Sequence, residues 1–140
     1  MVSADMKIMN YLARRDHSEA ELRQKLARSY EREEIDAAIE RAKESSWWPD
    51  PEVLAERTVA SLLGRGKGAF YIRQYLSQKG LPPKEVPADV EFQAAIDMIE
   101  RKFLIEESPE KVMRMLKNRG FRDGTIWKIK SEVLDSSQPE

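Results

Sequence analysis

The apolar residues of this chain recur with the period of an α-helix. From Ile8 to Val133 they fall at positions i, i+3, i+4 and i+7 of successive segments, so each segment has one apolar side. The sequence has no sustained alternation of apolar and polar residues with the β-branched enrichment that is typical of strands. The pattern predicts an all-α protein of about nine short helices joined by short connections.

Helix start and stop signals agree with this pattern. Ser18 and Glu21 have the spacing of a capping box, in which each side chain bonds to the backbone N–H of the other residue. Gly80 and Gly120 stand where a helix ends and the chain takes a positive φ, which glycine adopts without steric cost. An N-cap residue followed by proline at the first helical position occurs twice, as Asp50-Pro51 and Ser108-Pro109.

The composition narrows the class of protein. The 140 residues are 41% hydrophobic and 35% charged, and 24 Lys and Arg against 25 Asp and Glu give a net charge of −1, which excludes a histone-like polycation. The absence of cysteine excludes disulfide scaffolds, zinc–thiolate sites and iron–sulfur clusters, and it fits a reducing compartment. No apolar run reaches the roughly 18 residues of a membrane span, and Met1–Tyr11 lacks the apolar core of a secretory signal. We therefore expect a cytoplasmic protein without membrane contact.

Candidate catalytic and ligand-binding groups are scarce. His17 is the single histidine, so neither a histidine pair for a metal nor a Ser–His–Asp set can be assembled, and its place before Ser18 indicates a helix boundary. The glycines and lysine of Gly64–Gly68 lack the spacing of a phosphate-binding loop and follow a predicted helix rather than a strand. We therefore expect no enzyme activity, metal, cofactor or small-molecule substrate.

One helix pattern occurs three times along the chain. The matching triplets are Ser18, Leu22, Leu26; Gly68, Ile72, Leu76; and Ser108, Val112, Leu116. A unit of about 40 residues buries too little area alone, so such units are expected to stack. We predict three tandem three-helix repeats, at residues 1–48, 49–87 and 88–140, that form an elongated, curved array. Prolines at 82, 83 and 87 are expected to shorten the third helix of the middle repeat to about one turn, and the last repeat ends in a short C-terminal tail.

Three stretches of the sequence resemble a known family. Ala13–Leu26 (ARRDHSEAELRQKL) resembles the N-terminal motif of the RecX regulatory proteins. Leu54–Gly80, with Arg65-Gly66-Lys67-Gly68 and Ile72-Arg73-Gln74 in register, is similar to the central motif of that family. Lys102-Phe103 and Met115-Leu116, followed by Arg119-Gly120-Phe121 and Ile126, resemble its C-terminal repeat, so the likeness covers about Ile8 to Val133.

The resemblance implies both a fold and a function. RecX proteins are small bacterial cytosolic modulators, usually inhibitors, of the RecA recombinase, with three tandem three-helix repeats. They bind RecA filaments, and many bind DNA. The family often carries arginine where this chain has Ala60, Leu62 and Tyr71, so we expect weak binding to DNA alone.

The charges are unevenly distributed. Arg57–Lys84 and Lys111–Arg122 contain basic residues and no acids, whereas acids cluster at Glu31–Asp36. If equivalent helices of the repeats share one side, a basic stripe runs along it and can follow phosphates or meet an acidic protein surface. The alternative is an ordinary solvated face, with basic side chains covering apolar stems. Together with the resemblance, the pattern predicts a filament- or DNA-binding face of Arg65, Lys67, Arg73, Lys79, Lys111, Arg114, Lys117 and Arg119.

Two further features have alternative interpretations. The aromatic pair Trp47-Trp48 can stack on bases, but we expect it to fill space at a repeat junction, because each ring buries a large area. Gly66 and Gly68 are expected to make a turn with positive φ inside the middle repeat, the alternative being close approach of the backbone to a phosphate or a partner chain.

The resemblance thus implies a modulator of the RecA recombinase, usually an inhibitor in this family, and we expect the chain to bind the RecA–DNA filament and to limit its assembly or its activities. The alternative is a helical module that binds nucleic acid independently of RecA through units like helix-turn-helix motifs.

Overall fold

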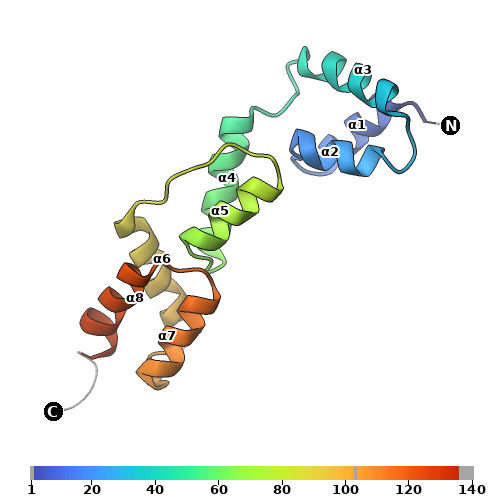
Figure 1. Ribbon diagram of the computed structural model, residues 1–140. Coiled ribbons are helices and arrows are strands. Elements are labelled where there is room, and N and C mark those ends of the chain that lie inside the picture. The colour runs from blue at the N-terminus through green and yellow to red at the C-terminus, as the bar shows by residue number, and fades with distance from the viewer. Residues whose placement is uncertain (1, 103, 136–140) are drawn as a thin grey trace. The chain divides into compact units, whose positions relative to one another are not determined.

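The chain is all-helical over the residues that the computed structural model describes, 2–102 and 104–135 (Figure 1). The eight α-helices are α1 Ala4–Arg14, α2 Glu19–Leu26, α3 Arg32–Lys43, α4 Pro51–Gly64, α5 Ala69–Gln78, α6 Ala88–Arg101, α7 Pro109–Asn118 and α8 Asp123–Ile129. A 3₁₀ turn covers Leu104–Glu106 and a π-helical turn covers Lys130–Leu134. These residues contain no strand, so the all-α expectation is confirmed. Phe103 and the tail after residue 135 lie outside the described residues.

The chain divides into two compact units. The first comprises Met1–Ala55 and Ser77–Pro82, and the second comprises Glu56–Leu76 and Pro83–Glu140. The division into three repeats stays a prediction. None of the described helices is both long enough and apolar enough to cross a membrane.

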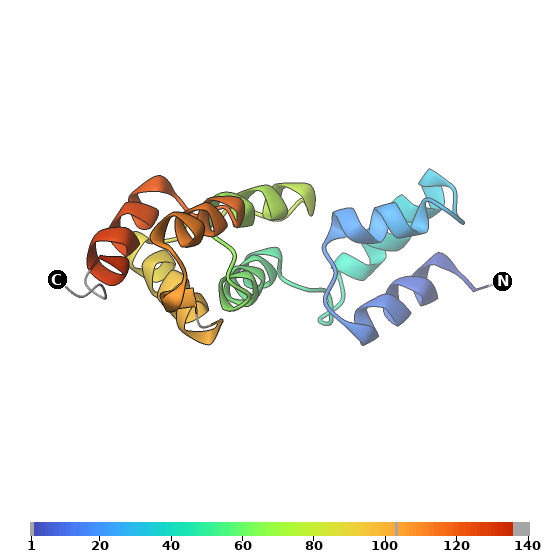
Figure 2. The same ribbon diagram turned by 90° about the horizontal axis from the view of Figure 1, so that it is seen from below.

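Helices α1, α2 and α3 form the body of the first unit (Figure 2). The capping box that starts α2 is present: the Glu21 N–H donates to Ser18 Oγ at 3.1 Å, and the Ser18 N–H donates to Glu21 Oε1 at 3.3 Å. These bonds satisfy two N–H groups that the first turn leaves without intrahelical partners. The fully buried core residues of this unit include Ile8, Leu22, Leu26, Ala38 and Ile39.

The second unit has its own core, made by α6, α7, α8 and the turns that join them. Ser108 caps α7 by accepting from the Lys111 N–H, and Pro109 stands at the first helical position, as the sequence predicts. The apolar spacing predicts nine buried positions, and all but one of them are at most 1% exposed. These nine positions are Leu22, Leu26, Ile39, Ile72, Leu76, Ile96, Ile99, Leu116 and Ile129. The exception is Ile96, which is only half-buried because it packs at the edge of this core.

The glycine predictions hold at three positions and fail at one. Gly80, Gly120 and Gly66 have φ of 66°, 85° and 78°. Gly68 does not have a positive φ. It is needed for another reason: a Cβ at Gly68 would lie 2.4 Å from the backbone nitrogen and Cα of Phe121. The close approach is therefore to the chain itself, rather than to a phosphate or a partner.

The expected short third helix of the middle repeat is wrong. Residues 81–87 form no helix, and α6 begins at Ala88. Prolines at 82, 83 and 87 explain this, because proline lacks the N–H of a helical hydrogen bond and restricts the residue before it to extended conformations.

Candidate binding face

The first turn of α5 is fixed by backbone hydrogen bonds to the end of α7. The Gly68 N–H donates to the Arg119 carbonyl at 2.9 Å, and the Phe70 N–H donates to the Gly120 carbonyl at 2.9 Å. The first N–H groups of a helix have no partner within the helix, so these carbonyls satisfy them. The two basic segments that the sequence singles out, around α5 and α7, thus meet within the second unit.

A buried carboxylate completes this junction. Glu91 of α6 is 0% exposed and accepts from the Ala69 N–H at 2.7 Å, from Arg122 Nε at 3.0 Å, from the Arg122 N–H at 3.3 Å and from Thr125 Oγ1 at 2.5 Å. Burial raises the pKa of Glu91, but the bonds from Thr125, Ala69 and Arg122 outweigh it, so the pKa lies below its ordinary value. Glu91 therefore remains a charged group that joins the starts of α5 and α8 to α6.

Glu91 is not among the site residues predicted from the sequence, although its position in α6 gives one signal that it is buried. It precedes the buried Ala95 by four positions and therefore lies on the inward side of α6. A charged residue on an apolar stripe is almost never fully buried unless it is paired.

Three of the predicted basic residues gather around the turn between α4 and α5. Arg119 Nη1 donates to the Arg65 carbonyl at 3.4 Å, and Lys67 Nζ lies 4.6 Å from the centroid of the Tyr71 ring. Tyr71 is 37% exposed and stacks on Tyr75, with the ring centroids 6.3 Å apart. The arrangement places cations beside an exposed aromatic surface.

In the part of the second unit that the structure describes, three arginine side chains have no hydrogen-bond or ion-pair partner. Arg65, Arg73 and Arg114 are exposed, and within the described residues their side chains make no hydrogen bond or ion pair. Arg122 of the same unit is instead held by Glu91 and by the Val86 carbonyl. The first three guanidinium groups are therefore available to a binding partner.

The remaining predicted cations have partners. Lys111 on α7 lies 3.2 Å from Glu107, and Lys117 lies 2.6 Å from Asp123. Both pairs are solvent-exposed, and such pairs contribute little to stability and exchange readily for other anions. These lysines project away from the buried side of α7 and remain compatible with the predicted face.

Lys79 lies in the other unit. Its Nζ is 3.6 Å from Glu21 Oε2, and a Cβ at the neighbouring Gly80 would lie 2.9 Å from the Cβ of Ala20. The end of α5 thus packs against the start of α2 inside the first unit. Lys79 is therefore paired, as Lys111 and Lys117 are, and it belongs to the first unit.

His17 is a buried neutral residue in the N-terminal motif. It is 2% exposed; its Nδ1 lies 2.9 Å from the Arg15 carbonyl and its Nε2 lies 2.9 Å from Lys25 Nζ. The carbonyl accepts and the ammonium donates, so Nδ1 carries the proton and Nε2 accepts from Lys25. Burial lowers the pKa of His17; the carbonyl bond opposes this, and the charges of Arg15 and Lys25 add to it. His17 lies at a helix boundary, as predicted, and is part of the fold.

The two neighbouring tryptophans Trp47 and Trp48 have different environments. Trp48 packs against the core of the first unit, as expected, whereas Trp47 is 45% exposed.

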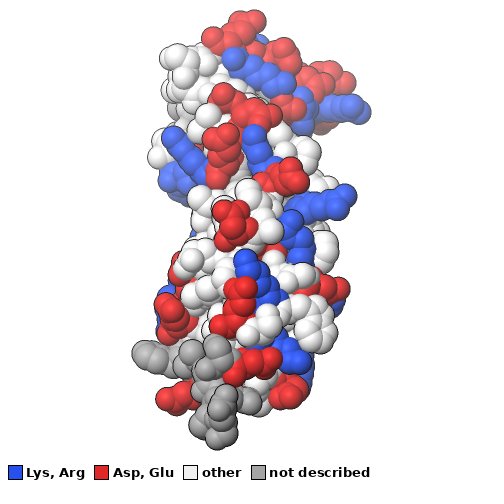
Figure 3. Space-filling model, turned by 90° about the vertical axis from the view of Figure 1, so that its left-hand side faces the viewer, with Lys and Arg blue, Asp and Glu red and all other residues white. Residues whose placement is uncertain are grey.

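On the face of the second unit shown in Figure 3, acidic and basic side chains are interspersed, so that face is not a basic patch.

Comparison with known proteins identifies the family. The model of the first three-helix domain of RecX matches residues 7–41. A "Regulatory protein RecX" of Cronobacter sakazakii is 38% identical over 136 residues, covering 82% of each chain, and one of Xanthomonas axonopodis pv. citri is 31% identical over 133 residues, covering 86% of this chain and 81% of the relative. A Haemophilus influenzae relative of the same name is 34% identical over 94 residues, and there the match spans 61% of the length of the relative.

Solved structures show the same fold. A crystal structure of RecX from Lactobacillus salivarius superposes with a TM-score of 0.75 at 19% identity, covering 95% of each chain. A second RecX crystal structure superposes with a TM-score of 0.76 at 21% identity, covering 92% of this chain and 72% of the other. The chain belongs to the RecX family of regulatory proteins.

Proposed function

We propose that the chain modulates a RecA recombinase, as an inhibitor, by binding the RecA–DNA filament through the basic residues of α5, α7 and the turn before α5. Its membership in a family of regulatory proteins supports a regulatory role. The proposed face consists of Arg65, Lys67, Arg73, Lys111, Arg114, Lys117 and Arg119 of the second unit. Lys79, in the first unit, is proposed as a separate contact.

The observation that carries the proposal is the contrast among the arginines of the second unit. Arg122 has the ion pair and carbonyl bond of a structural residue, whereas Arg65, Arg73 and Arg114 are exposed without a side-chain partner in the described part of the chain. An arginine presents a planar fork of donors that suits phosphates and carboxylates. Three such groups on segments without acids favour an anionic partner.

Three repeats at 1–48, 49–87 and 88–140 would let one chain contact more than one filament subunit. Linked contacts raise the effective concentration of each further contact, so individually weak contacts suffice. A chain bound in this way blocks the addition of subunits or covers the surface where other proteins dock on the filament.

A second candidate function, binding of single-stranded DNA without RecA, is favoured by the aromatic residues of α5. Phe70 is 53% exposed and Tyr71 is 37% exposed, beside Lys67 and Arg73. Bases stack on exposed aromatic rings, and neighbouring cations bind the backbone phosphates.

Fluorescence anisotropy of the labelled chain separates the two functions. The chain is titrated with RecA filaments on single-stranded DNA and with the same DNA alone, over a range of salt concentrations. Filament regulation predicts tight binding to the filament and weak binding to the DNA alone. Tight binding to DNA alone, with a binding constant that falls steeply with salt concentration, would favour the second function. In that case the slope of log K against log salt concentration should decrease in magnitude by about 1 for each phosphate contact that a mutation removes.

A further inference from the structure

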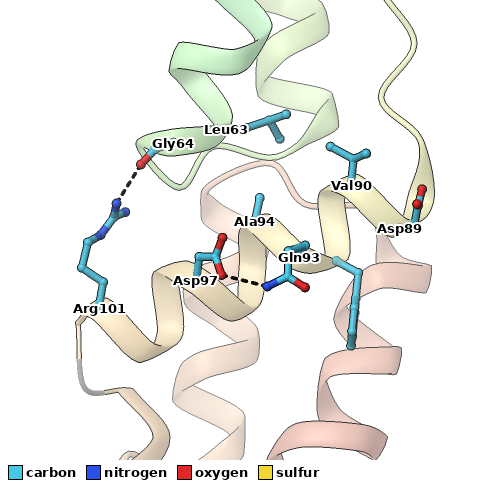
Figure 4. Close-up of a pocket in the computed structure, with 9 residues that line it drawn as sticks. Leu63, Gly64, Asp89, Val90, Gln93, Ala94, Asp97 and Arg101 are labelled. Atoms are coloured by element: carbon cyan, nitrogen blue, oxygen red, sulfur yellow. Dashed lines mark hydrogen bonds between the residues drawn. The ribbon is translucent and has the colours of Figure 1, made fainter.

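A cleft of about 680 Å³ lies between the end of α4 and one side of α6 in the second unit (Figure 4). Leu63, Val90 and Ala94 give it an apolar lining, and Val90 is 41% exposed. The small side chain of Ala94 stands between Val90 and Asp97 and leaves room for a neighbour to approach α6. Neither the repeat pattern nor the family motifs predict this cleft.

The polar groups of the cleft are arranged along its length. At one end Arg101 Nη1 donates to the Gly64 carbonyl at 2.8 Å and satisfies a carbonyl at the end of α4 (Figure 4). Asp97 accepts from Gln93 Nε2 at 2.8 Å. Asp89, in the first turn of α6, makes no hydrogen bond or ion pair within the described residues. The carboxylates of Asp89 and Asp97 therefore border the apolar lining of the cleft, and Asp89 has no hydrogen-bond or ion-pair partner among the described residues.

We propose that this cleft docks a basic amphipathic helix of a protein partner. One side of α6 presents residues 90, 94, 97 and 101, which have the spacing i, i+4, i+7 and i+11. Side chains with this spacing form the ridge that packs against a second helix. Asp89 and Asp97 are two turns apart, about 12 Å along the axis. The complementary helix carries two basic residues seven or eight positions apart, with apolar residues between them on the same side.

The charge of the cleft selects this occupant. Phosphates and anionic lipid surfaces would meet the carboxylates of Asp89 and Asp97, so like charges oppose those partners. The surface differs from the basic face of α5 and α7, and the inference does not depend on the proposed function.

A designed peptide tests the inference with the full chain. The probe is a labelled helical peptide of about 16 residues, with two lysines seven positions apart that bracket leucines on one side. The matched control peptide has the same composition, with its lysines on the opposite side. Amide chemical-shift changes and anisotropy report the location and the affinity of binding, and RecA is not needed.

We expect the first peptide to bind at least ten-fold more tightly than the control, with shift changes centred on α6 and the end of α4. Asp89→Lys combined with Asp97→Lys should weaken binding about ten-fold, and Ala94→Trp should abolish it by filling the cleft. Glu33→Lys combined with Glu34→Lys, an equal charge change on the exposed start of α3, should leave binding unchanged. Equal affinity for the two peptides, shifts centred on α5 and α7, or full binding by the Asp89 and Asp97 variant would overturn the inference.

Discussion

Glu91 Oε2 accepts a 2.7 Å hydrogen bond from the backbone N–H of Ala69, the first residue of α5. A buried carboxylate of α6 therefore fixes the start of the helix that carries Arg73. The same carboxylate group bonds Arg122 and Thr125 at the start of α8. The candidate binding face thus depends on a residue that does not belong to it.

Replacing this carboxylate should destabilise the protein strongly. Glu91→Ala removes the acceptor of the Ala69 N–H and one of the two acceptors of the Arg122 guanidinium, which keeps the Val86 carbonyl. A buried donor left without a partner costs about 1–3 kcal/mol, so we expect a loss of about 3 kcal/mol. Urea unfolding measures the change. Glu110→Ala, at an exposed position on α7, is the control and should change the free energy of unfolding by no more than about 0.5 kcal/mol. A Glu91→Ala variant as stable as the control would contradict the role assigned to Glu91.

The lowered pKa of Glu91 also predicts a dependence on pH. Because the folded state binds this proton less readily than the unfolded state, the carboxylate stabilises the fold above its ordinary pKa of 4.5. That contribution is lost as the pH falls below 4.5 toward the lower folded value. The stability difference between wild type and Glu91→Gln should therefore shrink over this range. Unfolding curves at several pH values measure it, and a difference that grows on acidification would refute the assignment.

His17 predicts a second and separate pH window. Its pKa lies below 6.5 in the folded state, so the unfolded chain takes up a proton that the buried imidazole resists. Wild-type stability should begin to fall as the pH drops below 6.5. His17→Gln should remove this part of the pH dependence, although it also costs stability at neutral pH. Identical pH profiles for the two proteins between pH 6.5 and 5 would argue against a buried neutral His17.

Lys79 and Arg73 should behave differently although both are basic residues of the α5 region. Lys79→Glu places an acid beside Glu21, so we expect a loss of about 1 kcal/mol, which is modest because the pair is partly exposed. Arg73→Glu breaks no side-chain hydrogen bond or ion pair among the described residues and should stay within about 0.5 kcal/mol of wild type. Melting temperatures measured side by side check the difference. If Lys79→Glu and Arg73→Glu lowered the melting temperature by the same amount, the ion pair of Lys79 with Glu21 would have no structural role of its own.

Two glycines provide a matched test of the packing between α5 and α7. Gly68→Ala forces a methyl group against the backbone of Phe121, and such overpacking costs about 1–3 kcal/mol. A methyl group added at Gly124 in α8 would have nothing within 4 Å, so Gly124→Ala should be neutral or should stabilise α8 by up to about 1 kcal/mol. Chemical denaturation of both variants measures their free energies of unfolding. Equal free energies of unfolding for Gly68→Ala and Gly124→Ala would mean that Gly68 serves only as a flexible turn.

The features that sequence reasoning predicts correctly are local. The capping box of Ser18 and Glu21 and the positive φ of Gly80 and Gly120 depend on neighbours within about one helical turn. The spacing of apolar residues likewise fixes the inward side of each helix, as the burial of Leu76 shows. Local spacing is visible in the sequence, so these elements could be predicted before the structure.

The features that sequence reasoning missed depend on distant partners. Glu91 bonds residues that are 22, 31 and 34 positions away, and Gly68 is constrained by the backbone of Phe121. The pairing of Lys79 with Glu21 likewise joins helices far apart in the chain. Periodicity shows that a side chain faces inward but not which group it meets. The basic segments were predicted, whereas the division of their cations into paired and unpaired groups needed the structure.

The most direct test of the proposed function is RecA-dependent ATP hydrolysis on single-stranded DNA, measured against the concentration of added protein. We expect the wild-type chain to suppress hydrolysis. The triple variant Arg65→Glu, Arg73→Glu and Arg114→Glu should need at least about ten-fold more protein for the same suppression, with an unchanged circular dichroism spectrum. Reversal of Glu33 and Glu34 to lysine should leave suppression intact. Full suppression by the arginine variant, together with loss of suppression in the Glu33 and Glu34 variant, would contradict a binding face on α5 and α7.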